Sequence, residues 1–110
     1  WWHNGLRLMD YTRGILVEGN RFIFEGESKS SARGILLHGK NVGLRTFIDE
    51  AGDWQSEIDP NRFRNNSYFG LLPNMAGPQK PGQPMNLVVG DRTIHLSGES
   101  DNPQFTWLDD

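Results

Sequence analysis

The sequence of 110 residues contains no cysteine, no surplus of positive charge and no long apolar run. Without cysteine, the chain can form neither a disulfide framework nor a thiolate metal site. Eleven Lys and Arg against fourteen Asp and Glu give a formal net charge of −3, which argues against a nucleic-acid partner. The longest apolar runs, residues 34–37 and 87–89, are far shorter than the roughly 20 residues that span a bilayer, so we predict no membrane insertion.

Short motifs that carry common catalytic or metal chemistry are also missing. The three histidines, His3, His38 and His95, do not have the spacing of metal ligands. No Gly-x-Ser-x-Gly stretch supports a serine nucleophile. Lys40 is followed by Asn41, where a phosphate-binding loop needs Ser or Thr. We therefore predict neither a metal nor a cofactor.

Glycine and aromatic residues are abundant, with 13 glycines and an aromatic content of 11%. Short β-branched or aromatic runs alternate with turn signals, as in an all-β protein. No window keeps a helical spacing of apolar residues, and only residues 51–66 leave room for a short helix. We predict strands near residues 6–9, 15–17, 22–24, 35–37, 42–48, 67–72, 86–89, 92–96 and 105–108.

The predicted organisation is one all-β domain over residues 1–110. Six prolines include four between residues 73 and 84, and this segment is predicted to be a surface loop that supports neither a helix nor a central strand. The chain starts with Trp1 and Trp2 and shows no leader pattern. We therefore expect a fragment or a terminal domain of a larger chain.

One eight-residue pattern occurs twice. "RGILVEGN" starts at Arg13 and "RGILLHGK" at Arg33, 20 positions later (33 − 13), with five identical positions. A looser third copy is "LVVGDRTI" from Leu87, which aligns with "LVEGNRFI" from Leu16, so that Val88 matches Val17. Such spacing is typical of a solenoid in which equal residues stack in successive coils, with apolar side chains inside and glycine at the corners. Asparagine after such a glycine tolerates a left-handed conformation and can hydrogen-bond in a ladder.

The stretch "RGILVEGNRF" followed by "ARGILLHGKNV" resembles the coils of right-handed parallel β-helix proteins, which include pectate-lyase-like enzymes and bacteriophage tailspikes. The resemblance covers about residues 6–48. It implies a short parallel β-helix that binds cell-surface polysaccharide along its stacked coils, outside the cell or on a virion. The tailspike resemblance also implies a homo-oligomer, specifically a trimer.

Two other folds remain open at this point. The turn residues Gly90 and Asp91 between two apolar runs also fit a two-residue hairpin of type II′. Repeated hairpins would give an antiparallel β-sandwich or barrel with the same glycine spacing. A mixed α+β domain is the third possibility.

Acidic residues gather in one segment, where Asp49, Glu50, Asp53 and Glu57 lie close to Trp54. Paired acids beside an aromatic platform are typical of clefts that process sugars. If the protein is an enzyme, we predict glycoside hydrolase or polysaccharide lyase chemistry by these four acids. The predicted substrate-binding residues are Trp54, Arg62 and Arg64, where either arginine would hold an acidic sugar.

Tryptophans near the two ends of the sequence suggest a second role. Trp1, Trp2 and Trp107 are predicted to cap the core or to contact another subunit, because burial near chain ends is difficult within one chain. The main hypothesis is therefore carbohydrate recognition, with or without cleavage. The alternative is a structural or interaction β-module that mediates oligomer assembly without catalysis.

Overall fold

A computed structural model describes residues 3–26, 32–72, 74–77, 85–96 and 105–109, and all regular structure in them is β. The all-β prediction is confirmed, whereas the short helix considered for residues 51–66 is replaced by strands. In the described residues no helix is long and apolar enough to cross a membrane. The strands are β1 (His3–Leu8), β2 (Leu16–Glu18), β3 (Arg21–Ile23), β4 (Ala32–His38), β5 (Leu44–Ile48), β6 (Trp54–Ile58), β7 (Asn61–Arg64), β8 (Ser67–Phe69), β9 (Asn74–Gly77), β10 (Met85–Val89), β11 (Arg92–Leu96) and β12 (Phe105–Trp107).

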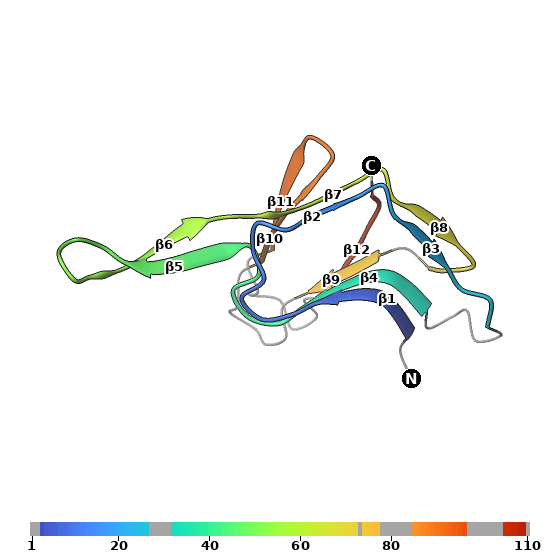
Figure 1. The fold of residues 1–110 in the computed structure, drawn as a ribbon, viewed down its shortest axis with the longest axis horizontal. Helices are drawn as coiled ribbons and strands as arrows, with labels where there is room; N and C mark the ends of the chain where they lie inside the picture. The colour runs from blue at the N-terminus through green and yellow to red at the C-terminus, as the bar shows by residue number, and fades with distance from the viewer. Residues whose placement is uncertain (1–2, 27–31, 73, 78–84, 97–104, 110) are drawn as a thin grey trace.

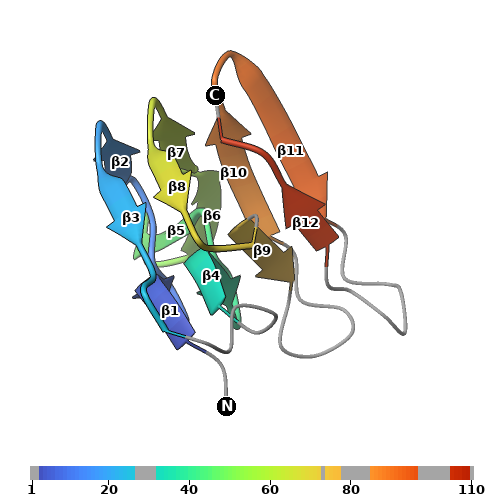
Figure 2. The ribbon, with the colours of Figure 1, turned by 90° about the vertical axis from the view of Figure 1, so that its right-hand side faces the viewer.

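Three groups of parallel strands form the body of the molecule. Sheet A has the order β1-β4-β9-β12, sheet B has the order β11-β10-β7-β2, and sheet C pairs β3 with β8. The strands are parallel within each of three groups, which are β1, β4 and β9 in sheet A, β2, β7 and β10 in sheet B, and β3 and β8 in sheet C. Figure 2 shows these parallel strands side by side, with β1, β4 and β9 in one group, β2, β7 and β10 in another, and β3 beside β8. The chain thus passes repeatedly through the same sheets.

Two strands depart from the parallel arrangement at one side of the body. Strand β11 pairs antiparallel with β10, and β12 pairs antiparallel with β9. The β10–β11 connection is the predicted two-residue turn, because Val89 pairs with Arg92 across Gly90 and Asp91. Gly90 has a φ of 62° and Asp91 has no positive φ, as a type II′ turn requires.

The repeated pattern does not stack on itself, so the expectation that its equal residues, such as Ile15 and Ile35, lie in successive coils of one stack is wrong. The first copy contributes β2 to sheet B, and the second contributes β4 to sheet A. In sheet A, Ile35 pairs with Leu6 of β1, 29 positions earlier (35 − 6). The physical reason is that strands in different sheets of this body end in the same way, with an apolar run followed by a glycine. The pattern therefore does not identify the sheet to which a strand belongs.

The third copy does share a sheet with the first, but at a shifted register. Both β2 and β10 pair with β7, and Phe63 of β7 is level with Val17 on one side and Val89 on the other. The sequence alignment had matched Val17 with Val88. Sheet B therefore places the two strands one residue away from the predicted match.

The proline-rich segment contains a strand that the sequence did not predict. Residues 74–77 form β9, which lies between β4 and β12 in sheet A. Asn74, Ala76 and Gly77 are buried there, so the prediction of a surface loop is wrong for these four residues. They contain no proline, and each keeps the backbone N–H that a sheet ladder needs. The rest of the segment, residues 73 and 78–84, lies outside the described residues.

The core lies between the parallel sheets (Figure 1). Each fully buried apolar side chain contributes about 1.5–3 kcal/mol relative to exposure. Phe63 is the largest of the fully buried side chains, and the Trp107 ring, 3% exposed, packs against it with 5.4 Å between the ring centroids. The buried cluster consists of Val17, Ile35, Leu37, Val42, Phe63, Ala76, Met85, Leu87, Val89 and Trp107.

Two glycines make room for a stack of aromatic rings beside this core. Phe22 of β3 and Tyr68 of β8 are paired in register, and their rings stack with centroids 5.4 Å apart and planes 7° apart. A Cβ atom at Gly5 would lie 2.4 Å from the Phe22 ring, and one at Gly34 would lie 2.3 Å from the Tyr68 ring. Sheet C can approach sheet A this closely only because glycine occupies both positions.

We predict that Gly34→Ala destabilises the protein by about 1–3 kcal/mol, because the new methyl group overlaps the Tyr68 ring in a packed interior. Chemical denaturation measures this free energy of unfolding. In a Tyr68→Leu background the same substitution should cost clearly less, since the colliding ring is gone. An equal cost in both backgrounds would contradict the proposed packing.

Candidate functional site

The predicted catalytic acids lie on a hairpin that projects from the body. Strands β5 and β6 pair antiparallel, and Figure 1 shows them extending away from the sheets. Asp49, Glu50 and Asp53 occupy the turn at its tip, and Glu57 lies on β6. The segment that was predicted to line a sugar cleft is therefore an arm, and its residues 50–58 are all exposed.

Asp49 closes the turn of this arm. Its Oδ1 atom accepts hydrogen bonds from the backbone N–H groups of Ala51 at 3.0 Å and Asp53 at 2.9 Å, and its Oδ2 accepts one from the side-chain Nε2 of Gln55 at 2.8 Å. The Asp53 N–H bond, followed by that of Gln55, lowers the pKa of Asp49 below its ordinary value. A carboxylate held ionised in this way is suited to shaping a turn, not to donating a proton.

The other predicted site residues of the arm do not converge on a common point. Glu57 forms an ion pair with Arg45 at 3.1 Å, on the strand directly opposite. Trp54 is paired in register with Ile48 and is 74% exposed, so it can act as a platform only on an open surface.

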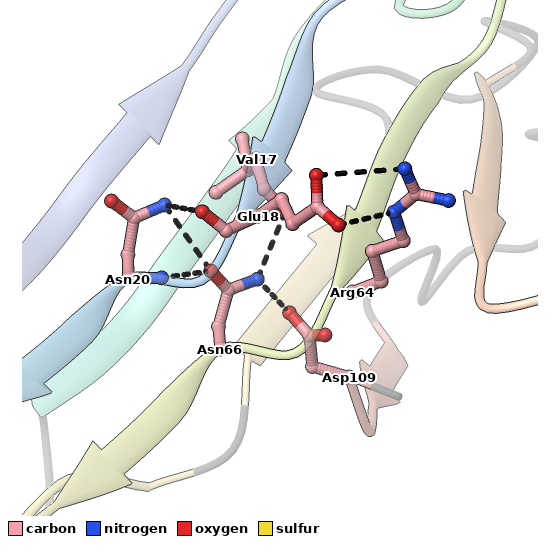
Figure 3. Close-up of polar contacts among 6 residues, drawn as sticks. All are labelled: Val17, Glu18, Asn20, Arg64, Asn66 and Asp109. Atoms are coloured by element: carbon pink, nitrogen blue, oxygen red, sulfur yellow. Dashed lines mark hydrogen bonds and ion pairs between the residues drawn. The ribbon is translucent and has the colours of Figure 1, made fainter.

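The two predicted sugar-binding arginines lie on β7, in sheet B of the body. Arg64 is level with Glu18 of β2, and its Nε atom lies 2.9 Å from the Glu18 carboxylate. This ion pair links neighbouring strands, and the Arg64 guanidinium is already bound to a carboxylate (Figure 3). Arg62 is exposed and is level with Leu16 and Val88. Both arginines are therefore on a different part of the molecule from the acidic tip.

The predicted interface tryptophans have different outcomes. Trp107 is 3% exposed and packs on Phe63 inside the chain, so of its two predicted roles the structure favours the one in the core over contact with another subunit. Its position in β12, next to β9, lets the chain bury it without a second subunit. Trp1 and Trp2 lie outside the described residues.

A polar network joins the turns at one corner of the body, and no sequence pattern pointed to its central residue, Asn66. Its Oδ1 accepts hydrogen bonds from the backbone and side-chain nitrogens of Asn20, at 3.0 and 3.2 Å (Figure 3). Its Nδ2 donates to the Val17 carbonyl at 3.1 Å and to the Asp109 carboxylate. Asn20 was predicted to take part in such a ladder, but Asn66 does not follow a glycine. These contacts tie together turns that are 46 residues apart.

Tyr68 extends this network toward the interior. Its hydroxyl donates to Asp109 at 2.7 Å and accepts from Asn74 at 2.6 Å. Burial is the main reason why the pKa of Tyr68 rises well above its ordinary value, and Asp109 adds to the rise. The hydroxyl therefore stays protonated and acts as a structural donor.

A cleft lies between β1 and β3, at the edge of the body formed by the first strands. Its volume is about 270 Å³. The ring of Phe22, which ends the stack with Tyr68, contributes to its wall. The full lining consists of Asn4, Gly5, Arg21, Phe22, Ile23, Phe24 and Leu71.

Two polar residues, Asn4 and Arg21, belong to the lining of this cleft. Asn4 Oδ1 has no hydrogen-bond partner among the described residues, but it is buried and therefore not itself accessible to a ligand. The Arg21 guanidinium lies over the Phe69 ring, 5.1 Å from its centroid, and forms no ion pair with a described residue. None of the described lining residues carries a carboxylate or an imidazole. The described lining thus contains aromatic rings, a cation and an amide, but no group for proton transfer.

Metal chemistry finds no support in the described part of the chain. No group of three or more His, Asp or Glu side chains is placed there to hold an ion. His95 uses its Nδ1 atom in a contact of 2.6 Å with Asn86 Oδ1, on the neighbouring strand.

Comparison of the chain with known protein families, with curated proteins and with solved structures finds no match.

We predict that Asn66→Gly lowers the free energy of unfolding by about 1–3 kcal/mol, because it removes a side chain that satisfies buried and shared polar groups. The matched control is Asn65→Gly. Asn65 is exposed with a φ of 57°, a conformation that glycine adopts readily, so this change should be nearly neutral. Equal losses in denaturation experiments would contradict the role of Asn66.

The lowered pKa of Asp49 predicts an acid-sensitive turn. A carboxylate whose pKa falls on folding stabilises the fold above its unfolded pKa, and this contribution disappears as the pH drops through the folded pKa. We expect an NMR titration to give Asp49 a midpoint below 3.8, with the Ala51 and Asp53 amides shifting at the same midpoint. A midpoint at or above 3.8 would show that these bonds do not form in solution.

Proposed function

We propose that the parallel strands form a short parallel β-helix. The support is the order of pairing: β1, β4 and β9 follow one another in sheet A as β2, β7 and β10 do in sheet B. Each pass of the chain would then be one coil, with β5 and β6 inserted into the second coil. Strands β11 and β12 would cap one end by antiparallel pairing.

For this domain we propose carbohydrate recognition, in particular of an acidic cell-surface polysaccharide encountered outside the cell or on a virion. The observation that carries the proposal is the cleft between β1 and β3. The Phe22 ring offers an apolar wall to a sugar face, Arg21 offers a cation to a carboxylate or sulfate, and the Asn4 amide adds a polar group to the same lining. Its volume is near the lower end for small-molecule sites, which suits one ring of a longer chain.

Binding without cleavage is the form of the proposal that the side chains favour. Glycosidases use two carboxyl groups that flank the scissile bond, about 5–9.5 Å apart. The described lining of the cleft has none, and the predicted acids lie on the β5–β6 arm. Arg21 and Asn4 therefore replace Arg62 and Arg64 as the proposed sugar-binding residues.

The alternative role, an interaction module, has separate support on a separate surface. The β5–β6 arm exposes three apolar side chains, those of Ile48, Trp54 and Ile58. The polar residues between them on the paired strands are Thr46 and Ser56. A protein surface is a better complement to such side chains than a polysaccharide.

Isothermal titration with an oligosaccharide that contains uronic or sialic acid tests the carbohydrate proposal. We expect Arg21→Gln to weaken binding roughly tenfold or more, since a hydrogen bond to a charged group contributes about 1.5–3 kcal/mol. Arg62→Gln is the matched control, because Arg62 is exposed and also unpaired among the described residues, and it should bind normally.

Two results would contradict this function. One is the absence of binding to every acidic glycan on an array. The other is equal binding by the wild type and by Arg21→Gln, which would place the ligand elsewhere on the molecule.

A further inference from the structure

The β5–β6 arm has one apolar face and one polar face. Directly paired residues of a hairpin share a face, and every second pair along it lies on the same face. One face therefore carries the pairs Leu44–Ile58, Thr46–Ser56 and Ile48–Trp54. Arg45 with Glu57 and Phe47 with Gln55 lie on the other side, where Arg45 bonds Glu57 and stacks over the Phe47 ring.

No described part of the chain covers the apolar face. Ile48, Trp54 and Ile58 are 57%, 74% and 62% exposed, and Figure 1 shows the arm standing clear of the three sheets. An isolated two-stranded hairpin is at best marginally stable in water. A contiguous apolar surface on such an element indicates a docking site.

We propose that this face docks onto the same face of a second copy of the chain, with the two arms antiparallel. The order of residue sizes along the arm is symmetric. An apolar pair lies at the base, the small hydroxyl pair Thr46 and Ser56 lies in the middle, and an apolar pair lies at the tip. Under a two-fold axis through the middle, each tip pair meets a base pair and the hydroxyls meet each other.

Charge decides the direction of the second arm. The tip carries Asp49, Glu50 and Asp53, so parallel arms would bring the carboxylates of both copies together. Antiparallel arms separate them and move each tip toward the base of the other arm. Arg13 lies at that base, because its neighbour Thr12 accepts a bond from Gly43 N and its neighbour Gly14 donates to Asp59 O.

The size of the surface makes the contact weak. The three exposed apolar side chains present on the order of 400 Å² per copy, about half of the roughly 800 Å² that each partner buries in a standard interface. We therefore expect a concentration-dependent dimer with a Kd of about 10–500 μM, not a permanent one. The trimer implied by the sequence resemblance is a different assembly, so the two are distinguishable by mass.

Sedimentation equilibrium from about 5 μM to 1 mM tests the pairing. The wild type should shift from monomer to dimer over this range, and Ile48→Thr should weaken the shift at least tenfold. The matched control is Ile23→Thr on β3, since Ile23 is equally exposed at 57% and lies outside the arm. NMR spectra of β5 and β6 amides would establish that the arm of the variant still folds.

Cross-linking tests the direction of the arms, and the chain's lack of cysteine makes single-cysteine variants clean probes. Thr46→Cys, at the middle of the apolar face, should link two copies through a short bismaleimide, whereas Gln55→Cys on the polar face should not. A monomer at 1 mM, a trimer, equal association of Ile48→Thr and Ile23→Thr, or stronger linking through Cys at position 55 would each overturn the proposal. The carbohydrate function rests on the cleft and would survive any of these results.

Discussion

Parallel backbone pairing between successive passes of the chain is the constraint on which the rest of the structure depends. Strand β7 shows this most clearly, because it is bonded to β2 on one side and β10 on the other. This pairing sets Val17, Phe63 and Val89 level with one another and buries all three. The same stacking brings the turns of two passes together at Asn20 and Asn66, so their amides satisfy each other and the adjacent backbone.

The sequence predicted the class of fold and many local features, but it did not predict which strands are neighbours. The apolar runs and the Gly90-Asp91 turn are local signals, and both are present in the structure. Strand pairing is a long-range property, and the similar ends of β2 and β4 made two different sheets look like one stack. The insertion of β5 and β6 also separates paired strands by 46 residues, from Leu16 to Arg62, which hides any regular period.

The candidate site residues also differ in whether the sequence alone or only the folded structure could identify them. Acidic residues beside Trp54 were visible in the sequence, yet they are close in sequence because they share one hairpin, not because they line a cavity. The cleft instead joins Asn4 to Arg21, two residues from separate strands that no local motif connects. Gly5 and Gly34 gave no signal either, since their importance depends on rings that come from sheet C.

Body and arm thus divide the molecule into a stacked scaffold with a polar cleft and an inserted hairpin with an apolar face. The parallel pairing of the scaffold strands is tested most directly by nuclear Overhauser effects between backbone protons of neighbouring strands. With this pairing, we predict contacts of the parallel type between Leu6 and Ile35 and between Arg62 and Val88. Contacts between Ile15 and Ile35, or close Hα–Hα pairs of the antiparallel type between β1 and β4, would contradict it.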